Sequence, residues 1–137
     1  MAKSYPDQRR GSVLAKSDMR PLVVVVDDDP AVRGSLTFSL ELDGFDVEAF
    51  ESGEALLLRQ LPPRPTCLVL DQKLPGISGL EALRQLRARH VETPAILITS
   101  HPQRSVVEAA AAAGVPIVEK PLLGDALLRD IHRALVA

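Results

Sequence analysis

The feature that most restricts the fold of this sequence is a set of short apolar runs, each ending in a polar side chain capable of chemistry. Segments with helical spacing separate the runs, an alternation typical of buried parallel strands joined by helices. The carboxyl ends of such strands meet at one edge of an open sheet, where ligands bind. We therefore expect the terminal polar residues to share one pocket: Asp27, Asp28 and Asp29 after 22–26, Asp71 after 67–70, Thr99 after 95–98, and Lys120 after 115–119.

From Pro21 onward, strand-like and helix-like segments alternate about five times. This pattern predicts an α/β fold with a doubly wound, five-stranded parallel sheet and helices on both faces. The second strand alternates apolar and acidic residues, so we expect it toward an edge of the sheet. The predicted strands are 22–26, 45–49, 67–70, 94–100 and 115–119, and the predicted helices are 30–43, 52–61, 79–90, 106–113 and 123–136.

The length and composition indicate one domain in a reducing compartment. A chain of 137 residues can bury an adequate core without disulfides. Cys67 is the single cysteine, so no disulfide forms within one chain. The longest clean apolar run, 22–26, is far shorter than the roughly 20 residues of a membrane-spanning helix. The first twenty residues lack the apolar centre of a secretory signal, and we expect a cytoplasmic protein.

The charge distribution divides the chain into an extension and a domain. Residues 1–20 carry five basic and two acidic side chains, and we interpret them as a flexible, polar N-terminal extension. Residues 21–137 form the expected domain. The whole chain has a net charge of −2 and residues 1–20 contribute +3, so the domain carries −5 and is mildly acidic. Nucleic-acid binding usually requires clustered Lys and Arg on one face, so we expect no direct contact with nucleic acid.

The residues expected at the strand ends indicate a metal and a phosphoryl group. Carboxylates crowded into one pocket repel each other unless a cation joins them, and Mg²⁺ prefers such oxygen ligands. A hydroxyl from Thr99 and an ammonium from Lys120 would suit the oxygens of a phosphoryl group. Asp71 is the candidate nucleophile. Asp29 directly precedes Pro30, so we interpret it as a helix cap rather than a metal ligand.

Taken together, the motifs resemble those of the response-regulator receiver domain, the phospho-accepting partner of sensor histidine kinases. The resemblance covers about residues 21–137. It implies a flavodoxin-like receiver fold with strand order 2-1-3-4-5. Some short sequence motifs are similar to those of the nitrogen-fixation-type transcription-factor branch of that family. The motifs are Val26-Asp27-Asp28, Asp71 followed by Leu74-Pro75-Gly76 and Ser78-Gly79, Thr99-Ser100, and Glu119-Lys120-Pro121, with Gly44-Phe45 and Ile98-Thr99 typical of that branch.

The resemblance implies a role for each residue of an Mg²⁺ centre. Asp71 would accept the phosphoryl group and also contact the metal. Asp28 would be a direct ligand, and Asp27 would act partly through water. The backbone carbonyl of Lys73 would supply a further ligand.

The resemblance also implies a phosphoryl-binding switch. Thr99 would bond the phosphoryl group and swing inward, and Lys120 would pair with it. The Lys120–Pro121 peptide is expected to be cis, as is common in this family. Ser100 and His101 are assigned to the rim of the pocket. The family usually has Tyr or Phe at the switch position of the fifth strand, where this sequence has Ile117, so the aromatic switch is degenerate here.

The function implied is a two-component response regulator that takes a phosphoryl group from a sensor histidine kinase and catalyses only its own phosphorylation and dephosphorylation. Its fourth helix, fifth strand and fifth helix would form the surface that binds a downstream protein, a phosphotransfer partner or a second copy of the chain. Met1 and the lack of a DNA-binding domain favour a free-standing receiver. Two alternatives stay open: a haloacid-dehalogenase-type phosphatase with Asp27 as nucleophile and Asp29 as acid, and a receiver-like scaffold that works without phosphorylation.

Overall fold

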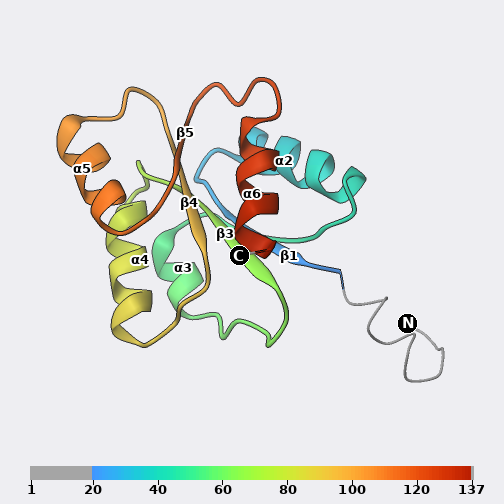
Figure 1. Cartoon of the computed structure of the whole chain (residues 1–137), viewed down its shortest axis with the longest axis horizontal. Helices are drawn as coiled ribbons and strands as arrows, with labels where there is room; N and C mark the ends of the chain where they lie inside the picture. The colour runs from blue at the N-terminus through green and yellow to red at the C-terminus, as the bar shows by residue number, and fades with distance from the viewer. Residues whose placement is uncertain (1–19, 137) are drawn as a thin grey trace.

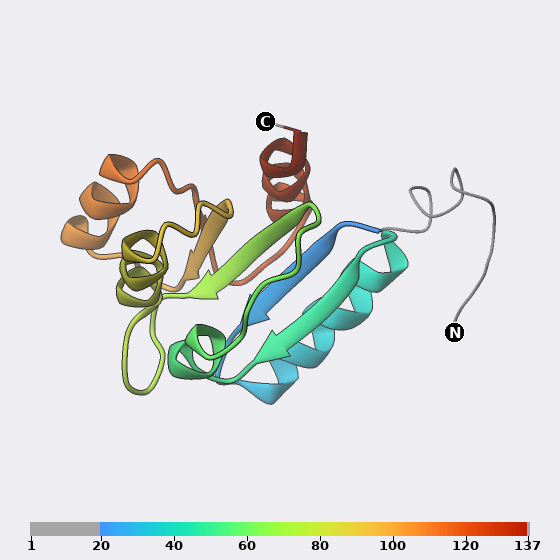
Figure 2. The ribbon, with the colours of Figure 1, turned by 90° about the horizontal axis from the view of Figure 1, so that it is seen from below.

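A computed structural model describes residues 20–136 as a five-stranded sheet covered by helices on both faces (Figure 1). All neighbouring strands pair in parallel, in the order β2-β1-β3-β4-β5 (Figure 2). The predicted fold class and strand order are therefore confirmed. The predicted extension over residues 1–20 lies outside the described residues except for Arg20. The strands are β1 (Leu22–Val26), β2 (Asp46–Phe50), β3 (Thr66–Asp71), β4 (Ala95–Thr99) and β5 (Ile117–Glu119).

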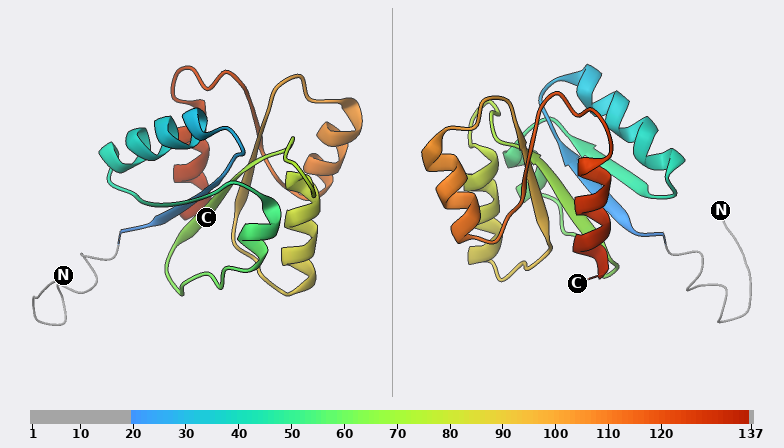
Figure 3. Two further views of the ribbon diagram at one scale, coloured as in Figure 1. Left: turned by 180° about the vertical axis from the view of Figure 1, so that it is seen from behind. Right: turned by 45° about the horizontal axis from the view of Figure 1, so that its top comes forward.

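The helices divide between the two faces of the sheet. Helices α2 and α6 pack on one face, and α3, α4 and α5 lie on the other (Figure 3). Within residues 20–136, no helix has the length and apolar character needed to cross a membrane. The helices are α2 (Pro30–Leu42), α3 (Gly53–Leu57), α4 (Gly79–Ala88), α5 (Arg104–Ala112) and α6 (Ala126–Val136).

The β1 strand shows why this sequence forms two cores. All five of its residues are buried, so an uninterrupted apolar run is required rather than an alternating one. Val23 and Val25 join the core beneath α2 and α6, whereas Val24 and Val26 join the core beneath the other three helices. Burying each valine contributes roughly 1.5–2 kcal/mol, which fixes β1 at the centre of the sheet.

Local capping places both ends of α2 close to where the sequence predicts them. Asp29 is the N-cap of α2 and accepts a hydrogen bond from Ala31 N at 2.9 Å, with Pro30 in the first turn. Gly44 lies beyond the end of the same helix with a φ of 97°, a conformation that glycine adopts without steric cost. The Lys120–Pro121 peptide is cis, as expected.

The predicted helix over 52–61 is too long, because α3 ends at Leu57. Two features keep the helix from continuing beyond that point. Arg59 donates two hydrogen bonds to the carboxylate of Glu48 on β2, at 2.8 and 2.6 Å. Pro62 and Pro63 also restrict the residues before them to extended conformations. Elsewhere the predicted bounds differ by up to three residues: α6 begins at Ala126 rather than Leu123, and β5 begins at Ile117 rather than Val115.

Candidate functional site

The register of the sheet brings acidic residues from β1 and β3 together. Val26 lies opposite Leu70, so the next residues, Asp27 and Asp71, leave neighbouring strands side by side. Carboxylate oxygens of Asp27, Asp28 and Asp71 all lie within 4.8 Å of one another. Asp27 and Asp71 are buried, whereas Asp28 is exposed. The three acids predicted to meet at the strand ends therefore do so.

Lys120 follows the edge strand β5 and reaches the two buried acids. Its Nζ donates to Asp27 Oδ2 at 2.9 Å and to Asp71 Oδ2 at 3.1 Å. Burial alone would lower the pKa of Lys120, but hydrogen bonds to both carboxylates and their negative charges outweigh burial and raise it. Lys120 therefore stays protonated and serves as a fixed cation within the acidic pocket.

Asp71 lies in an environment that opposes its ionisation. Burial raises the pKa of Asp71, and the nearby charge of Asp27 raises it further. Hydrogen bonding and charge from Lys120 act in the opposite direction, as does a 3.2 Å hydrogen bond from Lys73 N to Asp71 Oδ1, but they do not cancel the effect. Additional positive charge near Asp71 would therefore offset part of the cost of ionising it.

Arg33 supports the acidic turn, a contact that our sequence prediction missed. Its Nη1 donates to the main-chain oxygen of Asp27 at 2.8 Å. On the other side, Asp29 N donates to Asp27 Oδ1 at 2.9 Å. Arg33 precedes the buried Leu36 by three residues, so it lies on the inward side of α2. A charged residue on the buried side of a helix is the sequence signal that could have identified it.

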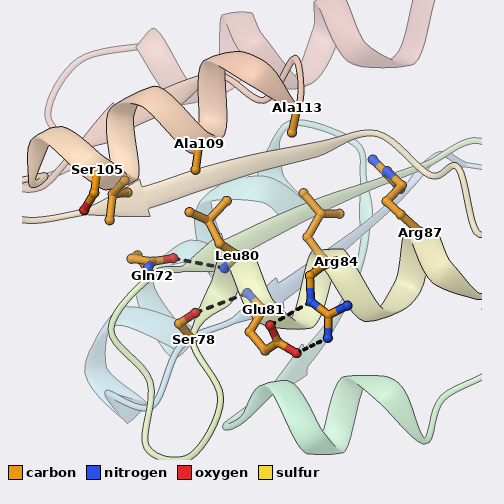
Figure 4. Close-up of a pocket in the computed structure, with 11 residues that line it drawn as sticks. Gln72, Ser78, Leu80, Glu81, Arg84, Arg87, Ser105, Ala109 and Ala113 are labelled. Atoms are coloured by element: carbon orange, nitrogen blue, oxygen red, sulfur yellow. Dashed lines mark hydrogen bonds and ion pairs between the residues drawn. The ribbon is translucent and has the colours of Figure 1, made fainter.

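The chain after Asp71 is held against the start of α4. Gln72 Oε1 accepts a hydrogen bond from Leu80 N at 3.0 Å, and Ser78 Oγ caps the helix by accepting from Glu81 N at 3.1 Å (Figure 4). Gly79 leaves no room for a side chain, because a Cβ there would lie 2.5 Å from the carbonyl oxygen of Asp71. The helix therefore begins directly against the residue expected to carry the phosphoryl group.

The predicted switch residues lie beside the acidic pocket. Thr99 ends β4 and is buried, and its hydroxyl donates to the main-chain oxygen of Ser100 at 3.2 Å. Among the described residues, that hydroxyl has no hydrogen bond to the acids. His101 is exposed, with a φ of 48°. Ile117 is half-buried in β5, opposite Leu97, and contributes to the core rather than to the acidic pocket.

The donor set fits a divalent cation by charge and by size. Three carboxylates and Lys120 have a formal charge of −2, which one divalent ion neutralises. Oxygens on opposite sides of an Mg²⁺ ion lie about 4.2 Å apart, so a group already within 4.8 Å needs only a small contraction. Asp28 and Asp71 would bind the ion directly, and Asp27 would act partly through water.

With this geometry established, comparison with known proteins assigns the chain to a family. Residues 23–132 match the Response regulator receiver domain, so the chain belongs to the receiver-domain family of two-component signalling proteins. These domains are signalling modules rather than conventional enzymes. The solved structure "CRYSTAL STRUCTURE OF FIXJ-N" is 35% identical with a TM-score of 0.78, covering 86% of this chain and 95% of that one. The "BeF3 Activated DrrB Receiver Domain" is 30% identical with a TM-score of 0.75, covering 87% and 100%.

The curated relatives are longer proteins. The "Transcriptional regulatory protein FixJ" of Rhizobium meliloti is 39% identical over 113 residues, which cover 82% of this chain and 55% of that protein. The "C4-dicarboxylate transport transcriptional regulatory protein DctD" of Pseudomonas aeruginosa is 37% identical over 125 residues, covering 90% and 27%. The chain thus spans between about a quarter and just over half of these two regulators.

Proposed function

We propose that this chain is the phospho-accepting receiver of a two-component system and that Asp71 carries the phosphoryl group. The observation that supports this most strongly is the bridge from Lys120 to Asp27 and Asp71, because it puts the Asp71 carboxylate beside one cation and close to two further carboxylates. Asp71 is the acid at the centre of this arrangement. Asp27 and Asp71 each accept one hydrogen bond on each oxygen, so hydrogen bonding does not distinguish them. The choice of Asp71 rests on its position at the end of β3 and on the motif of the receiver-domain family.

The reaction would form an O–P bond at Asp71 and break the N–P bond of a kinase phosphohistidine. Each Asp71 oxygen accepts one hydrogen bond and keeps a lone pair, which can attack phosphorus. Bound Mg²⁺ would neutralise charge on the phosphoryl oxygens. Lys120 would donate a hydrogen bond to a phosphoryl oxygen while it remains near Asp27. Lys73, through its main-chain carbonyl, would complete the metal ligands.

Phosphorylation would be transmitted through Thr99. Its hydroxyl bonds only a neighbouring carbonyl among the described residues, so this interaction can be exchanged for one with a phosphoryl oxygen at little cost. Exchanging this hydrogen bond would rotate the Thr99 side chain, and that rotation would change the surface formed by α5, β5 and α6. Ile117 replaces the usual aromatic residue, so we propose that the backbone around Thr99 and α5 carries the signal. Ser100 and His101 would line the rim.

The partners would follow from this switch. A cytoplasmic sensor histidine kinase would supply the phosphoryl group, and a downstream protein, a phosphotransfer partner or a second copy of the chain would bind α5, β5 and α6. We propose no direct contact with nucleic acid. A dimer through that surface predicts faster sedimentation when beryllofluoride and Mg²⁺ are added, and an unchanged monomer would contradict it.

The experiment that tests the proposal measures intact mass after incubation with Mg²⁺ and acetyl phosphate. We expect one phosphoryl adduct in the wild type and none in Asp71→Asn. An adduct that survives in Asp71→Asn would refute the assignment. General phosphatase turnover that is lost in Asp27→Asn would instead support a haloacid-dehalogenase-type enzyme, although Asp29, its required acid, is occupied as a helix cap. The absence of any adduct, together with no response to beryllofluoride, would support the scaffold alternative suggested by Ile117.

A further inference from the structure

The loop between β3 and α4, residues 72–78, is fastened to the first turn of α3. Glu54 Oε2 accepts a hydrogen bond from Ile77 N at 3.1 Å. Gly76 lies directly against the same carboxylate, with a φ of 78°, and a Cβ there would collide with Glu54. The Ile77 side chain covers Gly53, where a Cβ would lie 2.9 Å from Ile77 Cγ1. We call the contact among these four residues the α3 clasp.

The clasp acts on the segment that leads out of the candidate metal centre. The loop starts one residue after Asp71, and Lys73 N already donates to Asp71 Oδ1. At its other end, Gly79 N donates to Gln72 O at 3.2 Å, closing the loop at the start of α4. Helix α3 lies beside α4 in both Figure 1 and Figure 3, so it can hold the outer part of the loop.

We propose that Glu54 is a positioning residue for the divalent-cation centre. By accepting from Ile77 N, it holds the loop so that the main chain of Lys73 stays next to Asp71 before any ion arrives. An unfastened loop would have to be ordered during binding, and that entropic cost would weaken affinity. This inference rests on the proposed function, because it requires the ion to bind at Asp71.

Glu54 could instead matter only as a negative charge, and a pair of variants separates the two roles. Glu54→Gln keeps an acceptor oxygen for Ile77 N but removes the charge, whereas Glu54→Ala removes both. Glu51→Ala is the matched control, since it removes another exposed carboxylate three residues earlier in the chain. Because Glu54 is exposed, none of these changes opens a cavity in either core.

The test is a calorimetric titration of the full chain with Mg²⁺, together with thermal unfolding in EDTA. We expect Glu54→Ala to weaken Mg²⁺ binding about 3- to 10-fold, below the usual effect of a residue supporting a metal ligand because this hydrogen bond is exposed. Glu54→Gln and Glu51→Ala should stay within about twofold of the wild type. The unfolding temperature in EDTA should be similar for all four proteins, which a purely structural role of Glu54 would not give.

Several outcomes would overturn the inference. Wild-type affinity in Glu54→Ala would show that the clasp does not position the centre. Equal losses in Glu54→Gln and Glu54→Ala would show that charge acts rather than the hydrogen bond. If the wild type itself failed to bind Mg²⁺, the metal centre of the proposed function would be refuted, a result distinct from failure of the clasp alone.

Discussion

Replacing Lys120 by methionine should destabilise the metal-free protein by an amount that depends on pH. Lys120 is the cation that bridges Asp27 and Asp71, and its side chain is only 20% exposed. Removing one partner of a buried ion pair typically costs about 3–5 kcal/mol. The variant has one way to limit this loss, which is to protonate one of the two carboxylates.

The cost of that protonation sets the expected magnitude. An ordinary aspartate with a pKa of 3.8 requires about 4 kcal/mol to be protonated at pH 7, and about 2 kcal/mol at pH 5.5. We therefore expect Lys120→Met to lose about 3–4 kcal/mol of unfolding free energy at pH 7 and about 2 kcal/mol at pH 5.5. The sign follows because a carboxylate whose pKa is raised by folding favours the folded state more as the pH falls.

Urea denaturation in EDTA, followed by circular dichroism, measures this difference, since the chain has no tryptophan to report by fluorescence. Lys73→Met is the matched control, because it removes an exposed lysine two residues from Asp71 and should change stability by less than about 0.5 kcal/mol. A Lys120→Met variant as stable as the wild type, or one whose deficit stays constant between pH 5.5 and 7, would refute the reasoning.

Three further predictions concern single sites. Asp71→Asn should raise the metal-free unfolding temperature at neutral pH, because folding raises the pKa of Asp71, and the gain should vanish at about pH 3, below the ordinary pKa of 3.8, where the acid is largely protonated in both states; equal gains at both pH values would contradict this cause. Gly79→Ala should cost about 1–3 kcal/mol through collision with the Asp71 carbonyl, whereas Gly34→Ala, in open space on α2, should add about 0.5–1 kcal/mol, as urea denaturation would show. Burial raises the pKa of Cys67 to about 12, so iodoacetamide should label it only on unfolding, and rapid labelling of the native protein would refute this.

The sequence predicted the centre of the sheet because β1 depends on burial alone. The β1 run from Leu22 to Val26 has no polar residue on either side, so only a central position between two helical layers satisfies it. The position of Asp71 followed from the same rule, since a polar residue that ends a buried parallel strand lies where the carboxyl ends of the strands meet. Asp29 was predicted as a cap from Pro30 alone, and the structure confirms the cap.

What the sequence did not predict depends on pairings between distant side chains. The end of α3 depends on Arg59 reaching Glu48 on a neighbouring strand, eleven residues away in the chain. The support that Arg33 gives to Asp27 and the contact between Glu54 and Ile77 likewise require the fold to be known first. Helical periodicity and propensity describe only residues close together in the sequence, so they carry no information about these contacts.

The role of Asp71 as the carrier of the phosphoryl group is tested most directly by identifying the modified residue chemically. The protein is incubated with acetyl phosphate and Mg²⁺, any acyl phosphate is reduced with borohydride to homoserine, and the peptides are sequenced by mass spectrometry. We predict homoserine at position 71 and its absence when EDTA replaces Mg²⁺. Homoserine at position 27, 28 or 29 instead, or no reduced residue at all, would contradict this role.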